Sequence, residues 1–458
     1  MSLTSSLYAA LSALQADQGA MDVTSNNISN VNTPGYSREV ANLVESPPVT
    51  YGGLQYGTGV NLQNVQGVRD NILQLRLNQE TQTQSQLNTF VNGMNQIQPL
   101  FNDASGSGLQ SYISAFFNSF SSLSSDPTNS GYRQAVIEAG QNLAAAFNQT
   151  AGALTSQQQN ADLSVTQTVG QINSLAGQIA SLNGQISSLQ GAGATPNTLI
   201  DQRSQLINQL SQLVSVQTIS ANQGSLTLTT TGGAALVVGN QSFNLTTQTN
   251  STTGFQDVYS QGSDITSTIQ SGSLGGYIQL RDQEIPSILN NLNTLAYEVA
   301  NSVNTQSTAG YDLNGNAGVD FFNPPASLPT AALNLSVAIA DPNLVAASAD
   351  GTSGDSDNAT ALANLANQTI VNGQTPVNFY SGIVSEVGND TSNASSALTS
   401  QNLLVQQLQD QVGAVSGVSL NEEGGNLILY ENAYNAAARV ASVVASMFEV
   451  AISMGSTT

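Results

Sequence analysis

Apolar residues recur every seven positions at both ends of the chain, and this spacing predicts two long terminal helices. A seven-residue repeat is typical of a coiled-coil seam, because it keeps one narrow stripe of each helix facing a partner helix. Neither stripe is wide enough to stabilise a helix alone, so we predict that the two ends pack on each other and on neighbouring subunits. The positions of this expected assembly interface are Leu3, Leu7, Leu14, Met21, Ile28, Leu427, Tyr434, Ala441 and Phe448.

The middle of the chain combines helical and strand-like patterns. Short β-branched runs between glycine-containing turns predict strands near 225–229, 235–238 and 243–245, and 333–339 is also strand-like. Apolar residues at three- and four-residue steps predict helices over 71–100, 108–123, 133–150, 162–190, 199–214, 274–304 and 378–415.

These patterns predict an α+β fold that is mainly α. We expect an elongated stem of long antiparallel helices, with both termini in a coiled-coil-like terminal domain and small β-rich outer segments inserted into the stem. The expected terminal domain comprises residues 1–65 and 416–458, the stem 66–214, 274–310 and 376–415, and the outer segments 215–273 and 311–375.

The composition excludes many kinds of chemistry. The 458 residues include no Cys, His or Trp, and all seven basic residues are Arg. A Ser-His-Asp relay, a thiolate nucleophile, a zinc–thiolate site and a lysine Schiff base therefore all lack their central side chain. A net charge of −22 also disfavours nucleic-acid binding. We expect no catalytic residues, no cofactor, no metal and no nucleic acid.

Three acidic clusters remain as candidates for chemistry. Residues 312–320 carry oxygen side chains at alternate positions, as calcium loops do, but Ala317 and Asn323 stand where that pattern requires Gly and Glu. We favour a hydrogen-bonded Asx turn and leave ion binding open. Glu422 and Glu423 are expected to face the positive end of a helix dipole. The acids beside Arg281 are expected on a solvated helix face.

Two further patterns concern membranes and export. The most apolar stretch, 436–454, is interrupted by Arg439, Ser442, Ser446 and Glu449, so we interpret it as an amphipathic helix and expect no membrane contact. No basic residue precedes Arg38, so the positively charged region of a signal peptide is missing.

The end of the first predicted helix and the segment after it carry a recognisable motif, Ser25-Asn-Asn-Ile-Ser-Asn-Val-Asn-Thr-Pro-Gly-Tyr36. It resembles the N-terminal signature of bacterial flagellar rod, hook and hook-associated proteins, and the continuation Ser37-Arg38 points to the members at the hook–filament junction. Further similarity lies in 199–203, 275–281, 303–322 and 416–439, in the same order over almost the whole chain. The motif residues are Asn26, Asn27, Asn30, Asn32, Thr33, Pro34, Gly35 and Tyr36.

This resemblance implies a fold and a role. Such proteins pair their terminal helices in the inner wall of a tube and carry outer domains on a stem. The implied partners are further copies of the chain, the hook protein, the second hook-associated protein on the filament side, and a cytoplasmic chaperone at the C-terminal region. The implied route is export through the flagellar type III apparatus, which places the protein outside the cell after a transient cytoplasmic stage.

Two alternatives stay open. A hook or distal-rod subunit would share the terminal signature. An exported glycosidase would need two carboxylates about 5–10 Å apart in a cleft, usually with aromatic sugar platforms. The chain also departs from its relatives: Gly424 and Gly425 weaken a helix start, Ser307 stands where relatives often have His, and the β insert is short.

Overall fold

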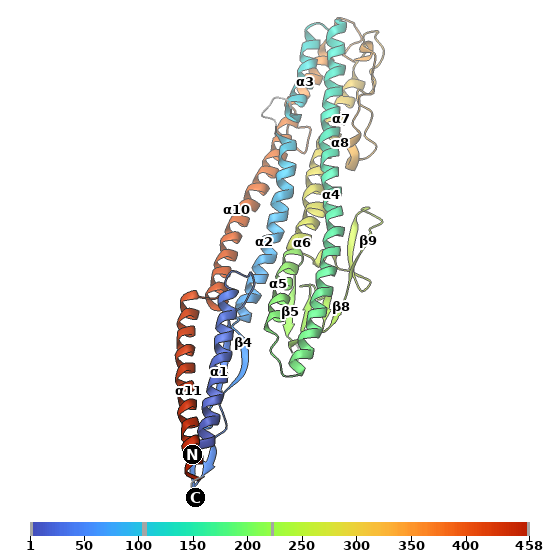
Figure 1. Cartoon of the computed structure of the whole chain (residues 1–458). Helices are drawn as coiled ribbons and strands as arrows, with labels where there is room; N and C mark the ends of the chain where they lie inside the picture. Colours follow the sequence, from blue (N-terminus) through green and yellow to red (C-terminus); the bar gives the residue numbers. More distant parts are fainter. Residues whose placement is uncertain (1–2, 103–107, 221–223, 456–458) are drawn as a thin grey trace.

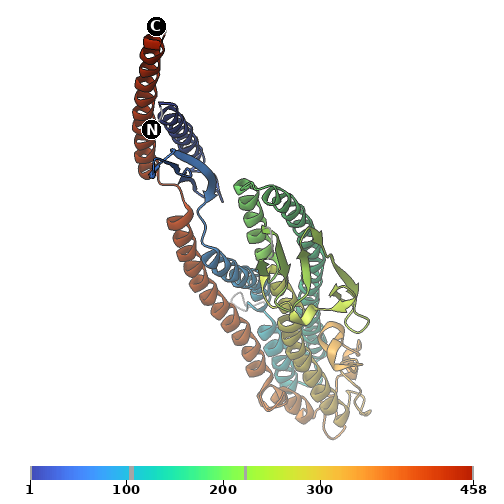
Figure 2. The same ribbon diagram turned by 90° about the horizontal axis from the view of Figure 1, so that it is seen from below.

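The computed structural model describes residues 3–102, 108–220 and 224–455 of an elongated molecule. Both chain ends lie at the same tip, where α1 (Leu3–Ser29) and α11 (Leu420–Gly455) run antiparallel, side by side (Figure 1). Viewed from below, this pair projects away from the other helices (Figure 2). The predicted mainly helical fold with small β inserts is confirmed. The first two and last three residues of the expected terminal domain lie outside the described residues.

Long helices form the rest of the molecule. The helix α4 spans 62 residues and extends from the far end of the molecule to the β inserts. Two separate helices were predicted over this stretch, but residues 151–161 contain no proline and bury Ala151, Leu154 and Ala161, so the helix continues. The other long helices lie alongside it. The bounds are α2 (Asn71–Ile97), α3 (Leu109–Ser125), α4 (Ser130–Gly191), α5 (Asn197–Leu213), α6 (Gly272–Gln279), α7 (Ile285–Ala309) and α10 (Pro376–Ser416).

A π-helical turn, Leu280–Glu284, joins α6 to α7 and changes the environment of the charges there. Arg281 is 1% exposed and donates hydrogen bonds of 2.7 Å to Asp162 of α4 and to its neighbour Asp282. The predicted solvated face concerned the two acids beside Arg281: Asp282 is exposed, whereas Glu284 is half-buried. The helical pattern around Arg281 does not show that α4 lies alongside and supplies a carboxylate.

Short antiparallel strands form the β inserts. One ribbon pairs β1 with β4 and has a bulge between Asn42 and Leu43, and the hairpin β2–β3 lies at its end. A second group forms the sheets β5-β6-β7-β8 and β11-β10-β9 against α4. The bounds are β1 (Glu39–Glu45), β2 (Val49–Tyr51), β3 (Leu54–Tyr56), β4 (Val60–Gly67), β5 (Gln217–Ser220), β6 (Leu226–Thr229), β7 (Ala235–Val238), β8 (Gln241–Ser242), β9 (Leu245–Thr249), β10 (Gln256–Ser260) and β11 (Ser263–Asp264).

The strand-like pattern at 333–339 forms no regular strand. The chain there ends the short helix α8 (Ala331–Asn334), and Val337 makes an isolated bridge to Phe322. Alternation was misleading because the apolar side chains Leu335 and Ile339 are anchors for an irregular segment that packs on the helical core. A further short helix, α9 (Asp357–Asn364), completes this outer end.

Two separate hydrophobic cores stabilise the body of the molecule. The outer core lies at the end far from the termini and contains six phenylalanines that are at most 2% exposed: Phe116, Phe117, Phe120, Phe147, Phe321 and Phe322. The second core lies between α4, α5 and the β5–β8 sheet. Because α4 contributes buried residues to both, it fixes their separation along the molecule.

Candidate functional site

The paired terminal helices are only partly buried in the single chain. All nine residues of the expected assembly interface lie on α1 or α11, and every one of them is half-buried. Full burial is confined mainly to small or polar residues such as Ala16, Ala20 and Thr24 on α1 and Val444 on α11. Small residues let the two helix backbones approach closely, but they bury little apolar area. The pair therefore buries less apolar area than the cores of the stem do.

A second apolar row on α11 has no cover in the single chain. Its side chains are between 51% and 70% exposed, although all are large and apolar. The three- and four-residue steps from Val440 to Met454 are a signal for this row, but the seven-residue repeat does not include these positions. Large contiguous apolar patches on a soluble surface mark interaction sites. The row comprises Leu429, Val440, Val443, Met447, Val450 and Met454, with Ile428 at its edge.

Asn27 lies in the last turn of α1 and is the centre of the motif, which continues into the following turn. Its amide nitrogen donates to the backbone oxygen of Glu39 at 2.8 Å and to Oε2 of Glu423 at 3.1 Å. Its amide oxygen accepts from the Tyr36 hydroxyl at 2.8 Å and from the Glu39 backbone N–H at 2.9 Å. The side chain is 1% exposed and uses both donors and both acceptor sites. One amide thus joins α1, the turn, β1 and α11.

Other motif residues shape the turn itself. Asn30 donates to the backbone and side-chain oxygens of Asn26, both at 3.0 Å, and Thr33 donates to Asn30 at 3.1 Å. Gly35 has φ +74°, and a Cβ there would collide with the Gln205 side chain, which itself donates to the Pro34 carbonyl. The turn therefore needs glycine for both its backbone conformation and its close contact with α5.

The same loop is attached to the stem through Asp201. This carboxylate of α5 is 7% exposed and accepts from the backbone N–H and hydroxyl of Ser37, at 3.0 and 2.7 Å. It also accepts from Nε and Nη2 of Arg69, at 2.9 and 2.7 Å. Four charge-assisted hydrogen bonds on one buried carboxylate make a strong connection. Asp201 and Arg69 were not singled out individually in the sequence analysis, although 199–203 contributed to the resemblance.

Glu422 and Glu423 have different partners. Glu422 forms an ion pair with Arg38, whose backbone N–H donates to the Ser416 carbonyl at 2.8 Å. Glu423 is 3% exposed and binds Asn27. The two acids therefore bind the start of α11 to the motif loop, on two sides, and do not form a facing pair of the kind that glycoside hydrolysis requires.

Burial raises the pKa of two groups in this region. The pKa of the Tyr36 hydroxyl is raised by burial and by the negative charges of Glu39, Asp201 and Glu423, so it remains a neutral hydrogen-bond donor to Asn27. Burial also raises the pKa of Asp17 on α1. Both shifts favour the uncharged form, because removing a group from water disfavours its charged form.

Comparisons with known proteins agree with this geometry. Residues 94–322 match the family model described as flagellar hook-associated protein FlgK helical domain, and residues 7–36 match the flagella basal body rod protein model. The flagellar hook-associated protein 1 of Salmonella typhimurium is 30% identical, over 99% of this chain and 100% of its own length. The chain belongs to the flagellar hook-associated protein 1 family. It is a structural subunit of the bacterial flagellum.

Other members of the family give the same result. The flagellar hook-associated protein 1 of Bacillus subtilis is 29% identical, over 95% of each chain. The solved structure of the flagellar hook junction protein FlgK from Burkholderia pseudomallei shares the fold, with a TM-score of 0.68, 19% identity, and coverage of 74% of this chain and 100% of that one. The Salmonella alignment extends over 553 positions, so that hook-associated protein contains segments without a counterpart here.

The rod-protein match coincides with α1 and the turn. Residues 7–36 hold most of the N-terminal seam and end at Tyr36, the hydroxyl donor to Asn27. The part of the chain shared with rod proteins is therefore the part that forms the terminal pair, whereas the match to the helical domain covers parts of both cores.

The remaining acidic candidate has a structural role. Burial acts to raise the pKa of Asp312, but hydrogen bonds from Asn316 and Asn314, together with the charge of Arg133, lower it below its usual value. Its Oδ1 accepts the backbone N–H groups of Asn314 and Asn316 at 2.8 and 2.9 Å, which is an Asx turn. Within the described ranges, no group of three or more His, Cys, Asp or Glu side chains could hold a metal ion.

One helical stretch is long and apolar enough to be compared with membrane-spanning helices. By length and composition alone, Pro376–Met454 contains a window that could cross a membrane, and 11% of that window is buried. The exposed row of α11 explains this hydropathy. Arg439, Ser442 and Glu449 interrupt the stretch, and α1 covers one side of the helix.

Proposed function

We propose that this chain is a non-catalytic building block of the hook–filament junction, assembled through its paired terminal helices. The observation that carries the proposal is the uncovered apolar row of α11. It lies beside a seam that is itself half-buried, at the tip where both termini meet. The proposal also draws on the relatives, whose names describe a hook-associated protein and a hook junction protein.

The expected partners follow from the location of this row. Copies of the chain would pack α11 rows and α1 seams against one another, with the hook protein on one side and the second hook-associated protein on the filament side. Only 8% of the residues are charged, so few ions need to be desolvated when such flanks become buried. The domain limits proposed above, 1–65 with 416–458, place these contacts in one unit.

Export is the second part of the proposal. The chain would pass unfolded through the flagellar type III apparatus, with a cytoplasmic chaperone on its C-terminal region before assembly. With no Cys there is no disulfide to reduce before transit. Because α1 and α11 bury little apolar area against each other, they would separate readily. A chaperone that covers the α11 row would prevent premature association.

A matched pair of variants tests the assembly role. Leu429→Gln changes the open row of α11, where the side chain is 62% exposed, and Leu163→Gln changes an equally exposed leucine (60%) on α4. We expect both to fold as the wild type does, and Leu429→Gln combined with Val443→Gln to leave hooks without filaments in electron micrographs. Leu163→Gln should support normal filaments. Normal filaments with the α11 double variant would contradict the proposal.

The alternatives give different outcomes in the same micrographs. Loss of a hook or distal-rod subunit would remove the hook itself, whereas loss of a junction subunit leaves the hook in place. A carboxylate-dependent glycosidase is disfavoured by the separate partners of Glu422 and Glu423 and by the absence of Trp platforms.

A further inference from the structure

A cavity of about 530 Å³ lies where α2, α5 and the β5–β6 hairpin meet, close to the attachment of the motif loop. Its walls combine polar side chains with aliphatic ones such as Ile200 and Ile207, and they include two of the seven arginines in the chain. Within the described residues, no acidic side chain lines it. The lining residues used below are Arg69, Arg203 and Ser204, with hydroxyls from Thr218, Ser220 and Ser225.

The two arginines differ in how their charge is balanced. Arg69 binds Asp201 through Nε and Nη2. Arg203 is 6% exposed, and its Nη1 donates only to neutral acceptors, Oδ1 of Asn183 at 2.8 Å and the Gly224 carbonyl at 2.6 Å. The buried Nε of Arg203 has no hydrogen-bond partner among the described residues. The walls therefore contain one buried cation without a carboxylate.

A buried cation without a counter-charge is unfavourable and rare. Burial, together with the nearby charge of Arg69, lowers the pKa of Arg203 to about 10, so the guanidinium remains charged at neutral pH. The contrast with Arg281 is informative, because Arg281 is equally buried but binds the carboxylates of Asp162 and Asp282. Arg133, a third buried arginine, has the charge of Asp312 nearby. For Arg203, the charge that acts on its pKa is that of another cation, Arg69.

We propose that this cavity binds an oxyanion, a carboxylate or a phosphate, between Arg203 and Arg69. Guanidinium groups bind such anions with paired hydrogen bonds, and the surrounding hydroxyls can donate as well. The overall charge of −22 does not prevent this, because charges farther away than about 8 Å are largely screened at physiological ionic strength. The anion would supply the missing charge beside Arg203.

Two sources could supply the same chemistry: a free inorganic anion, or an acidic side chain of a neighbouring copy in the assembly. The anion site itself does not depend on the junction role. If a neighbouring copy supplies the carboxylate, the inference then rests on the proposed function, and the two must be tested separately.

The first test is calorimetric titration of the full chain with inorganic phosphate and with acetate, at constant ionic strength in chloride. We expect saturable binding of at least one anion to the wild type, and a loss of at least about tenfold in affinity in Arg203→Gln. Arg439→Gln removes an exposed arginine from α11 and should bind as the wild type does. No saturable binding of either anion to the wild type would overturn the proposal, as would equal binding by Arg203→Gln.

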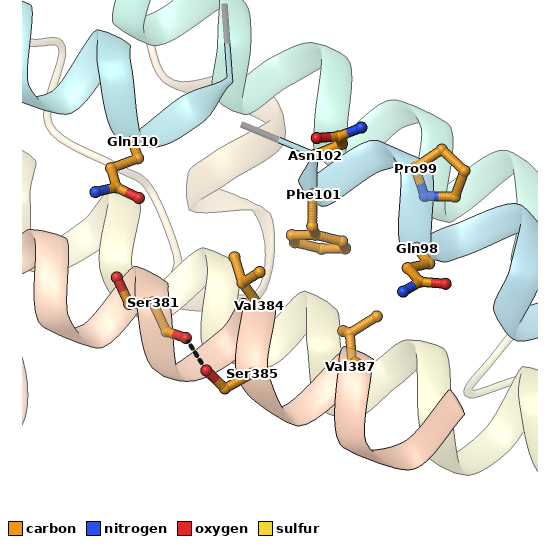
Figure 3. Close-up of a pocket in the computed structure, with 10 residues that line it drawn as sticks. Gln98, Pro99, Phe101, Asn102, Gln110, Ser381, Val384, Ser385 and Val387 are labelled. Atoms are coloured by element: carbon orange, nitrogen blue, oxygen red, sulfur yellow. Dashed lines mark hydrogen bonds between the residues drawn. The ribbon is translucent and has the colours of Figure 1, made fainter. Parts of the chain in front are cut away.

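A second test does not require Arg203 to be changed. Ser204→Asp would place a carboxylate in the cavity wall, whereas Ser381→Asp adds the same charge to a matched site: both serines are half-buried and donate at 2.9 Å to the carbonyl four residues earlier. The groove around Ser381 is lined by uncharged side chains (Figure 3). We expect Ser204→Asp to raise the thermal midpoint by about 2 °C and to abolish phosphate binding, and Ser381→Asp to lower the midpoint. A lower midpoint for both variants would count against the site.

Measurements of self-association distinguish the two possible sources of the anion. If added phosphate weakens association of wild-type chains in analytical ultracentrifugation, and Ser204→Asp weakens it as well, the carboxylate of a second copy occupies the cavity. If phosphate binds and association is unchanged, the ligand is a free anion. Failure of the junction role would appear as normal filaments in the α11 double variant, with no change in these binding curves.

Discussion

The outer core and the terminal pair of helices represent two different ways of using apolar side chains. In the outer core, Phe116 is 0% exposed and its ring lies 5.3–5.4 Å from four other phenylalanine rings. In the terminal pair, Leu429 and Met454 are 62% and 70% exposed, although they are comparable in hydrophobicity. The outer core is complete within one chain, whereas the terminal pair is not.

The two ends of the molecule therefore differ in whether their apolar side chains are covered within one chain. The outer end has its own densely packed interior, which does not depend on a neighbour. In the proposed assembly, the apolar rows of the tip stay exposed in the single chain so that a neighbour can cover them. The motif around Asn27 and Asp201 connects the two ends, since it binds the incomplete pair to the complete stem.

The largest expected effect is in the outer core. Phe116→Ala removes a fully buried ring and should lower the free energy of unfolding by about 3–5 kcal/mol, because it loses buried area and leaves a cavity. Chemical denaturation monitored by circular dichroism measures this. A loss below about 1 kcal/mol would show that this end is far looser than described.

The next effect tests the connection. Asn27→Ala removes an amide with four hydrogen bonds and leaves Glu423 buried without that partner, which should reduce the protection of α1 amides by about 1–3 kcal/mol in hydrogen exchange. Asn32→Ala, at an exposed position of the same motif, is the control and should leave protection unchanged. If α1 amides were equally protected in both variants, the hydrogen bonds of Asn27 would not stabilise the terminal pair, and the prediction would be wrong.

A smaller effect depends on pH and lies within the stem. Burial, with the charges of Asp390 and Glu386, raises the pKa of Glu284 to about 7. Between pH 4.5 and 7 the folded chain keeps a proton that the unfolded chain loses, so stability falls as pH rises through this window. Glu284→Gln should abolish this loss and gain on the order of 1 kcal/mol above pH 7, after allowance for solvent screening, with no gain below pH 4.5. Urea denaturation at pH 4.5 and 8 would show it, and an equal gain at both pH values would contradict it.

The smallest effect is expected on the open row. Leu429→Ala should change the free energy of unfolding of the single chain by less than about 0.5 kcal/mol, because most of the side chain is already in water. Thermal unfolding of the monomer checks this. A loss comparable to that of Phe116→Ala would mean that the row is buried in the free chain, and the comparison of the two ends would fail.

Much of the fold was accessible from local patterns. The first helix ends at Ser29, one residue after Ile28, the last position of its seven-residue repeat, because this repeat is a local signal. The division of α4 into two helices was wrong, because the Ala- and Gln-rich segment between them has no strong periodicity. Its burial depends on helices and strands that are distant in sequence.

The site was accessible only in part. The motif was recognised, but the four bonds of Asn27 could not be predicted, since Glu423 lies 396 residues away in the sequence. Glu423 was interpreted through the helix dipole, which any acid in a first turn would satisfy. Asp201 and Arg203 lie in one short segment but have opposite roles, and this becomes visible only when Arg69 and Asn183 are placed around them.

The uninterrupted α4 also sets a length and a phase. At about 1.5 Å per residue, its 62 residues correspond to a rod of roughly 93 Å. Inserting or deleting a single residue between the two cores would turn one relative to the other by about 100°, whereas seven residues would nearly restore their orientation and change the spacing by about 10 Å. Changes of length in this helix therefore preserve the relative orientation of the two cores only in steps such as seven, 11 or 18 residues, so α4 fixes both the spacing and the orientation of the cores.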